Sequence, residues 1–174
     1  ILFSGYPFSK DYTQPRGHQN ALVDILATQR VSATTHATCY SCKSSDNPGL
    51  WVQMGMETYD AMLFSEMTPN INNPIGCANC HEAGSMRLVL TNPAVEAALQ
   101  AEGVDWTTFS RQQMRSLVCA NCHVTYYFSG ENKLLTVPWA NGTHVEDIIS
   151  YEDAANFSDW TYPATGTPIM KARH

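Results

Sequence analysis

Apolar residues recur at the three- and four-residue spacing of an amphipathic helix in several stretches of the chain. The clearest stretch is 18–30, in which Ala21, Leu22, Ile25 and Leu26 form one stripe. Residues 92–103 open with an Asn-Pro pair and close with a glycine, which are typical residues of a helix start and a helix end. Further helices are predicted over 54–67, 110–118 and 145–157.

One part of the chain has the alternating pattern of a β-strand instead. Val124, Tyr126 and Phe128 alternate with their neighbours, a turn is expected at Gly130, and a second apolar run follows at 134–137. The predicted fold class is therefore mainly α, with much irregular chain and one small β-hairpin. Because no low-complexity tract or linker divides the sequence, we expect residues 1–174 to form a single domain.

The composition limits the kinds of partner. Charged residues make up 15% and hydrophobic residues 44% of the 174 residues, so a long disordered region is not expected. The net charge of −6 argues against a nucleic acid or an anionic membrane as a partner. An anionic substrate would need a local positive site, because the overall field repels it.

The six cysteines fall into three C-x-x-C pairs. Two pairs are followed directly by His81 and His123, and C-x-x-C-H is the attachment signature of c-type haem. The remaining pair is followed by Lys43, which would exchange an imidazole ligand for an alkyl amine on one haem. The thioether-forming residues are Cys39, Cys42, Cys77, Cys80, Cys119 and Cys122.

Two other uses of the cysteines fit the sequence less well. A disulfide framework does not require a two-residue spacing three times over. A four-thiolate zinc site would use two pairs, leave the third without a role, and make the residue after each pair a coincidence. We therefore predict three covalently bound c-type haems, which implies a periplasmic protein in a bacterium.

Lys43 and Arg30 each have an ordinary interpretation as well. Lys43 would be a surface side chain if its haem took a ligand from elsewhere, and Arg30 would suit the last turn of a helix because of the helix dipole. The six histidines do not by themselves force an open iron; they are His18, His36, His81, His123, His144 and His174.

Several segments together resemble the pentahaem cytochrome c nitrite reductases. They occur in the family order over nearly the whole chain: Gly5-Tyr-Pro-Phe-Ser-Lys-Asp-Tyr12, Pro15-Arg-Gly-His18, Cys39-x-x-Cys-Lys43, Cys119-x-x-Cys-His-Val-x-Tyr-Tyr-Phe128, Phe157-Ser-Asp-Trp160 and Thr167-Pro-Ile-Met-Lys-Ala-Arg-His174. The resemblance implies a periplasmic enzyme that reduces nitrite to ammonium with six electrons at a lysine-ligated haem. It also implies hydroxylamine or nitric oxide as further substrates.

The resemblance assigns roles position by position. It implies that Lys43 is the proximal ligand of the catalytic haem, whose opposite face is open to substrate, and that Arg30, Tyr126 and His174 form the distal pocket. His81 and His123 would be proximal ligands of electron-transfer haems, and His18 the distal ligand of the haem attached at Cys119 and Cys122. His36 and His144 receive no role. No distal ligand is assigned to the haem at Cys77 and Cys80.

The distal residues suit nitrite chemistry. Arg30 and a protonated His174 would hold the anion and stabilise charge as an N–O bond breaks, and imidazole exchanges protons near neutral pH. Tyr126 would hydrogen-bond intermediates and relay protons. The ordinary alternatives are an aromatic on a half-buried strand for Tyr126 and a frayed terminus for His174.

The chain departs from the family at its calcium site. Where the family has a glutamate and a glutamine, this chain has Thr125 and Arg173, while the family lysine is kept as Lys171. Calcium prefers oxygen ligands, which arginine lacks. We therefore predict no calcium, with the Arg173 guanidinium replacing its charge as in a calcium-independent branch of the family.

The chain also lacks segments that the family has after the position of His174: two further C-x-x-C-H motifs and long dimerisation helices. We therefore expect a three-haem catalytic segment of a longer, five-haem enzyme, or a truncated variant, and a homodimer only with the missing part. The family's electron donors are quinol-oxidising membrane cytochromes. The alternative function is a multihaem electron carrier without turnover.

Overall fold

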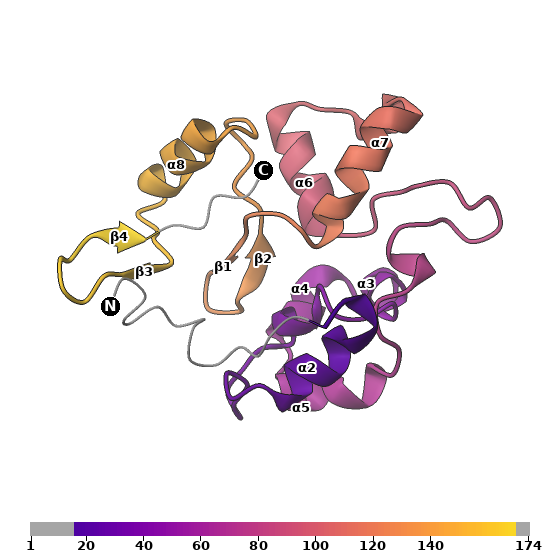
Figure 1. Cartoon of the computed structure of the whole chain (residues 1–174), viewed down its shortest axis with the longest axis horizontal. Coiled ribbons are helices and arrows are strands. Elements are labelled where there is room, and N and C mark those ends of the chain that lie inside the picture. Colours follow the sequence, from indigo (N-terminus) through magenta and orange to yellow (C-terminus); the bar gives the residue numbers. More distant parts are fainter. Residues whose placement is uncertain (1–15, 170–174) are drawn as a thin grey trace.

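The structure is a computed structural model that describes residues 16–169. It is mainly helical, with two small antiparallel sheets and much irregular chain, which confirms the predicted fold class (Figure 1). The helices are α2 (Ala21–Ala27), α3 (Asn47–Met54), α4 (Met56–Ala61), α5 (Phe64–Met67), α6 (Pro93–Glu102), α7 (Arg111–Leu117) and α8 (Val145–Ala154). The short 3-10 turns are η1 (His18–Asn20), η2 (Ala37–Tyr40), η3 (Thr68–Asn70), η4 (Cys77–Asn79), η5 (Trp106–Thr108) and η6 (Val118–Asn121).

Two predicted helices have the ends that their capping residues require. The Asn92 side chain accepts a hydrogen bond from the Ala94 amide at 3.0 Å, and Gly103 ends α6 in the left-handed conformation with φ of 82°. Ser110 caps α7 in the same way, through a hydrogen bond from the Gln113 amide. The prediction of α8 is also confirmed, although the helix ends at Ala154 rather than at 157.

Two other predicted helices are shorter than expected. The helix expected over 18–30 ends at Ala27, because Thr28 adopts an extended conformation, so Arg30 lies beyond the helix and not in its last turn. The helix expected over 54–67 is interrupted at Gly55, whose φ of 78° disfavours a side chain, and again at the extended Leu63. It is therefore split into α4 and α5.

The predicted hairpin is present, and a second one accompanies it. Strand β1 (Tyr127–Ser129) pairs antiparallel with β2 (Leu134–Thr136), with Phe128 opposite Leu135. The prediction of only one hairpin is wrong, because β3 (Trp160–Thr161) pairs with β4 (Pro168–Ile169). Strands of two residues are too short to show alternation in the sequence.

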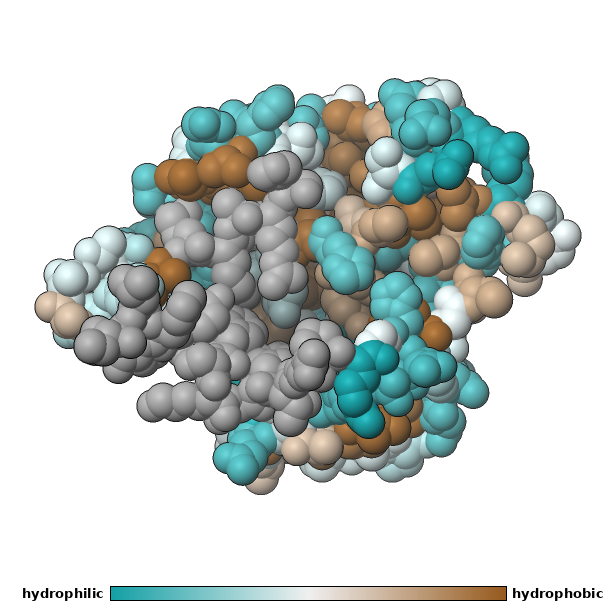
Figure 2. Space-filling view, in the orientation of Figure 1, coloured by the Kyte–Doolittle hydropathy of each residue, from teal (hydrophilic) through white to brown (hydrophobic). Residues whose placement is uncertain are grey.

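The β1–β2 hairpin lies between the helices α2 to α5 and the helices α6 to α8 (Figure 1). Each group of helices has its own hydrophobic core. The first core holds the α2 to α5 region and is formed by Leu22, Ile25, Ala37, Tyr40, Trp51, Tyr59, Phe64, Met67 and Ile71. The second core holds the α6 to α8 region and includes Val95, Leu99, Leu135, Trp139 and Ile148. Hydrophilic residues gather over the α7 end of the face in Figure 2. Within residues 16–169, no helix is long and apolar enough to cross a membrane.

A buried carboxyl joins the first core to β2. Asp60 is fully buried, and its Oδ2 accepts a hydrogen bond from the Leu135 amide at 2.8 Å. Its backbone carbonyl accepts from His36 Nδ1 at 3.0 Å. Burial raises the pKa of Asp60 to about 6, and the hydrogen bonds from Leu135 and Thr38 and the charge of His36 oppose this rise in part.

The raised pKa of Asp60 predicts a pH-dependent stability. The folded state keeps a proton that the unfolded chain releases near pH 3.8, so stability falls as pH rises from there to about 6. The shift corresponds to about 3 kcal/mol of unfolding free energy as an upper limit. Asp60→Asn is expected to flatten this part of the pH profile in denaturant unfolding.

Asp46→Asn is the matched control for that experiment. Although burial raises the pKa of Asp46, hydrogen bonds from Asn73 and Asn72 lower it below its ordinary value. Its contribution to stability is therefore lost only as pH falls through the acid range. Its replacement should leave the fall in unfolding free energy between pH 4 and 6 in place. A slope in Asp60→Asn equal to that of the parent protein would contradict the assignment.

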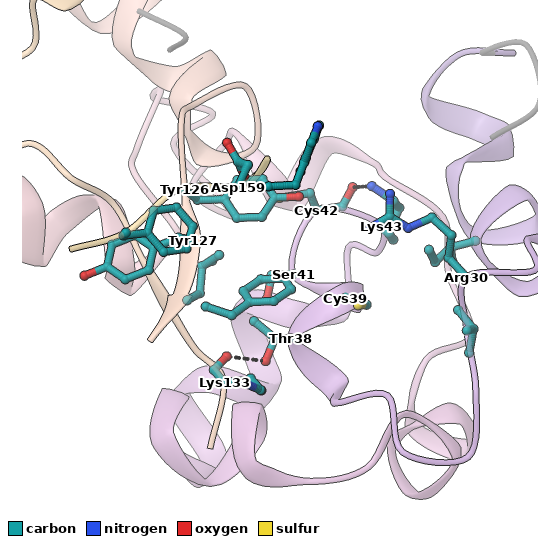
Figure 3. Close-up of a pocket in the computed structure, with 16 residues that line it drawn as sticks. Arg30, Thr38, Cys39, Ser41, Cys42, Lys43, Tyr126, Tyr127, Lys133 and Asp159 are labelled. Carbon is teal, nitrogen blue, oxygen red and sulfur yellow. Dashed lines mark hydrogen bonds between the residues drawn. The ribbon is translucent and has the colours of Figure 1, made fainter. Parts of the chain in front are cut away.

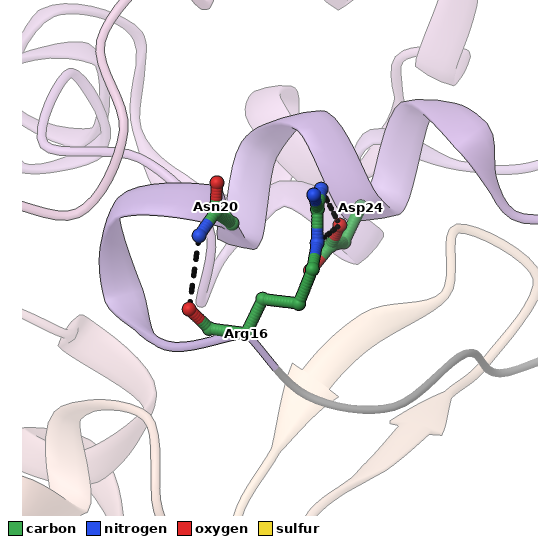
Figure 4. A network of polar contacts seen from close by, with 3 residues as sticks. All are labelled: Arg16, Asn20 and Asp24. Carbon is green, nitrogen blue, oxygen red and sulfur yellow. Dashed lines mark hydrogen bonds and ion pairs between the residues drawn. The ribbon is translucent and has the colours of Figure 1, made fainter.

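Hydrogen bonds fix the entry into α2 (Figure 4). The Arg16 guanidinium pairs with Asp24, and Asn20 Nδ2 donates to the Arg16 carbonyl at 2.9 Å. These contacts close the η1 turn over the first residues of α2. The turn holds His18, one of the predicted haem ligands.

Candidate functional site

Each C-x-x-C motif borders its own cavity. The cavity at Lys43 has a volume of about 450 Å³ and is also lined by Cys39 and Cys42. The cavity at Cys119 and His123 measures about 650 Å³, and the one at His81 about 860 Å³. All three fall within the range of about 300–1,000 Å³ that is typical of cofactor and ligand sites.

The second and third motifs form the same tight turn. The Cys77 carbonyl accepts from the amides of Cys80 at 3.0 Å and His81 at 2.8 Å. The Cys119 carbonyl does the same for Cys122 at 3.2 Å and His123 at 2.7 Å. The first motif differs, because the Lys43 amide bonds one residue further along, to the Tyr40 carbonyl at 2.8 Å.

His81 is oriented as a metal-binding imidazole. Its Nδ1 donates to the Met86 carbonyl at 2.8 Å, which fixes the tautomer and leaves Nε2 with its lone pair. A backbone carbonyl on the far nitrogen is a usual arrangement for a histidine ligand. The arrangement therefore fits a haem iron on the other side of the ring.

The rings of His18 and His123 lie at a separation that fits one metal ion between them. Their ring centroids are 6.0 Å apart. An imidazole nitrogen lies about 2.0–2.1 Å from a bound metal, taking zinc as the guide, so one ion bonded to both rings fits this separation. The geometry suits the pairing of His18 with the haem attached at Cys119 and Cys122.

The Lys43 cavity brings together residues from distant parts of the chain (Figure 3). Arg30 and Lys43 lie on one side of it, while Tyr126 and Tyr127 lie across from them. Lys43 Nζ donates to the Cys42 carbonyl at 3.4 Å. A cation, an amine and a phenol thus surround the cavity of the motif that lacks histidine.

The charges around the thiols show how close these groups are. Burial raises the pKa of the Cys39 thiol, whereas the positive charges of Arg30 and Lys43 lower it. Both cations therefore act on the same sulfur, one of the two that would hold the haem. A hydrogen bond with Cys42 is the main cause of the raised pKa of Cys122, followed by burial, so the first and third motifs are adjacent.

The other predicted residues are placed as follows. Thr125 is buried beside Tyr126. His36 is partly buried and bonded to Asp60, and His144 is exposed at the N-cap of α8, which agrees with ordinary structural roles for both. Lys171, Arg173 and His174 lie outside the described residues.

Some residues of the Lys43 cavity had no predicted role. They include Tyr127, Asp159 and Trp160. Asp159 and Trp160 belong to a segment that carries the family resemblance, so a signal for them was present in the sequence. Within residues 16–169, where all six cysteines lie, no three His, Cys, Asp or Glu side chains are grouped to hold a metal ion.

Comparison with known proteins identifies the family. All residues from 1 to 174 match the family model described as cytochrome c552. The chain belongs to the cytochrome c552 family. A cytochrome c holds its haem covalently through cysteines, so the family agrees with the C-x-x-C motifs and the cavities beside them.

Relatives within the cytochrome c552 family are similar over the whole chain. Cytochrome c-552 of Parabacteroides distasonis is 46% identical, and that of Bacteroides thetaiotaomicron is 44% identical, each covering 100% of this chain. The chain spans 37% of the length of both relatives.

A solved structure agrees with the fold. The cytochrome c nitrite reductase from Desulfovibrio desulfuricans superposes with a TM-score of 0.75 and 32% sequence identity, over 95% of this chain and 37% of that one. That enzyme is described as having two calcium sites in the structure of its catalytic subunit.

Proposed function

We propose that this chain carries the nitrite-reducing centre of a pentahaem cytochrome c nitrite reductase, which converts nitrite to ammonium with six electrons. The observation that carries the proposal is the cavity that joins Lys43 to Arg30 and Tyr126. The similarity to a solved nitrite reductase supports it. An electron carrier has no need of an anion-binding cavity at a motif with a changed ligand.

The haems would be held by the three C-x-x-C motifs, with Lys43, His81 and His123 as proximal ligands and His18 opposite His123. When bound, the haem at Cys39 and Cys42 supplies electrons and an iron to which the nitrogen of nitrite can bind. Lys43 must present a neutral amine, because a protonated amine has no lone pair for a metal. The proposal assigns three haems to this chain and five to the complete enzyme.

Arg30 would bind nitrite in the proposed centre. The chain carries a net charge of −6, so a local cation is needed to bring a small anion into the cavity. A guanidinium is planar and offers paired N–H donors, which match the two oxygens of nitrite. The same donors stabilise negative charge on an oxygen as the N–O bond breaks.

Proton delivery is assigned to Tyr126 and His174. Tyr126 is half-buried, and its ring lies 5.5 Å from that of Phe128, which fixes it at the cavity wall. Its hydroxyl would hydrogen-bond the departing oxygen. His174, outside the described residues, would supply the proton as an imidazolium, because histidine exchanges protons near working pH.

We further propose that this centre works without calcium. Thr125 is buried and offers a single hydroxyl where the related enzymes have a carboxylate, and Arg173 brings a positive charge. Thr125→Glu combined with Arg173→Gln is expected to create calcium binding, because it adds a carboxylate and an amide oxygen and removes a cation. Calorimetry measures this directly, with the unaltered protein as control; no heat of binding in the double variant would contradict the account.

The context of this centre follows from the same assignment. We propose that residues 1–174 are one catalytic segment of a longer periplasmic enzyme that receives electrons from a quinol-oxidising membrane cytochrome. Hydroxylamine and nitric oxide fit the same cavity chemistry as nitrite. A homodimer is assigned only to the complete enzyme.

Exogenous ligands test the proposed function. Nitrite or cyanide added to the oxidised holoprotein is expected to change the absorption spectrum of one haem, and the reduced protein is expected to convert nitrite to ammonium. A spectrum that neither anion alters, together with no ammonium, would contradict the proposal and indicate an electron carrier. Haem content by mass checks independently that the haems are attached.

A further inference from the structure

Two buried asparagines connect the three C-x-x-C turns. Asn79 Nδ2 donates to the carbonyl of Ser44, the residue after Lys43, at 2.8 Å. Asn121 Nδ2 in turn donates to the carbonyl of Asn79 at 2.9 Å. The two side chains are only 4% and 3% exposed. We call Asn79, Asn121 and these two hydrogen bonds the asparagine link.

The opposite ends of both amides are also bonded. Asn79 Oδ1 accepts from the Gly76 amide at 2.9 Å, within its own turn. Asn121 Oδ1 accepts from the amides of Thr91 at 3.0 Å and Asn92 at 3.2 Å, in the segment between the second and third motifs. A buried group that must donate on one side and accept on the other suits an asparagine side chain.

The two asparagines hold the same position in their motifs. Each is the residue before the second cysteine in two identical sequences, Cys-Ala-Asn-Cys-His, which end at His81 and His123. Both side chains donate to backbone carbonyls at the preceding motif or directly after it, across 35 and 42 residues. The first motif has Ser41 at this position. It takes part in the asparagine link only through the Ser44 carbonyl, which follows the motif and accepts from Asn79.

We propose that Asn79 and Asn121 are positioning residues that set the mutual geometry of the three haems. Thioether bonds would tie each haem to the two cysteines of its turn, so a shift of one turn relative to the next moves the attached haem with it. The inference rests on haem attachment at the three motifs and not on nitrite turnover. The link has long-range hydrogen bonds that join one turn to another, which a role in local folding does not require.

Circular dichroism in the Soret region tests the proposal, because coupling between haems depends on their mutual orientation. Asn79→Ala and Asn121→Ala are expected to retain all haems by mass and to lose most of the bisignate Soret signal. Asn47→Ala is the matched control. Asn47 is as buried, and its amide bonds to the Tyr40 carbonyl at 2.7 Å and the Tyr59 hydroxyl at 2.8 Å, so it serves one motif only. Its variant is expected to keep the signal.

Thr91→Val provides a second variant that preserves side-chain shape. The Thr91 hydroxyl donates to the same Asn79 carbonyl at 2.9 Å, so its removal should weaken the Soret signal in the same direction, by less. An unchanged signal in the haem-complete asparagine variants, or in Thr91→Val should those variants not assemble, would overturn the proposal. A parent protein that shows the Soret signal but turns over no nitrite would count against the proposed function and would leave this inference in place.

Discussion

Replacing Lys43 by histidine is expected to leave all haems attached but to slow nitrite turnover by about tenfold to a hundredfold, the range seen when a metal's ligand environment is disturbed. The cysteines that hold the haem are unchanged, so attachment should persist. An imidazole differs electronically from an amine, and axial-ligand identity is a main determinant of haem potential. Potentiometric titration should show that the reduction potential of one haem has shifted while the potentials of the others have not.

Lys133→His is the matched control for this exchange. Lys133 also lines the Lys43 cavity but lies outside the C-x-x-C motifs, so it separates iron ligation from a general effect of a lysine-to-histidine exchange at this cavity. It is exposed, and its contact with Thr38 is made by its backbone carbonyl, which a substitution retains. This variant should keep the parent's haem potentials and rates. Steady-state rates and potentials in Lys43→His equal to those of the parent would remove lysine ligation from the account.

Replacing Arg30 by alanine is expected to lower kcat/KM for nitrite by about 10²–10³-fold, as when a preorganised donor to a developing negative charge is removed. Arg30→Lys should recover part of the loss, because the charge remains but the paired N–H donors do not. The measurement is steady-state kinetics with nitrite, together with a nitrite titration of the oxidised protein.

Arg111→Ala provides the comparison for Arg30. Arg111 is an exposed arginine at the start of α7 and does not line the Lys43 cavity. Its removal changes the net charge by the same amount, so any general electrostatic effect on nitrite should appear equally in both variants. Equal kinetics in Arg30→Ala and Arg111→Ala would show that Arg30 does not bind the anion.

Local signals in the sequence predicted those elements whose ends are set by capping residues. The start and the end of α6 follow from Asn92 and Gly103, and the start of α7 from Ser110. The helix predicted over 18–30 ends early although the apolar stripe is real, because Thr28 becomes extended without any proline or glycine to mark it. The periodicity of apolar residues does not record that boundary.

The candidate site was predictable to the extent that covalent motifs define it. The spacing of the C-x-x-C pairs located Lys43, His81 and His123. Only the family resemblance placed Arg30 and Tyr126 with Lys43, because their approach depends on how distant segments pack. The asparagine link had a signal in the repeated motif, but a polar residue between two cysteines gives no indication of its partner. Asp60 had none, because a buried carboxyl looks the same in a sequence as an exposed one.

The most direct measurement is an experimental structure of the haem-loaded protein at a resolution that shows ligand bonds. The account predicts the Lys43 Nζ bonded to the iron of the haem held by Cys39 and Cys42, with no protein side chain on the opposite face. A Lys43 Nζ beyond bonding distance, or a protein ligand occupying that opposite face, would contradict it.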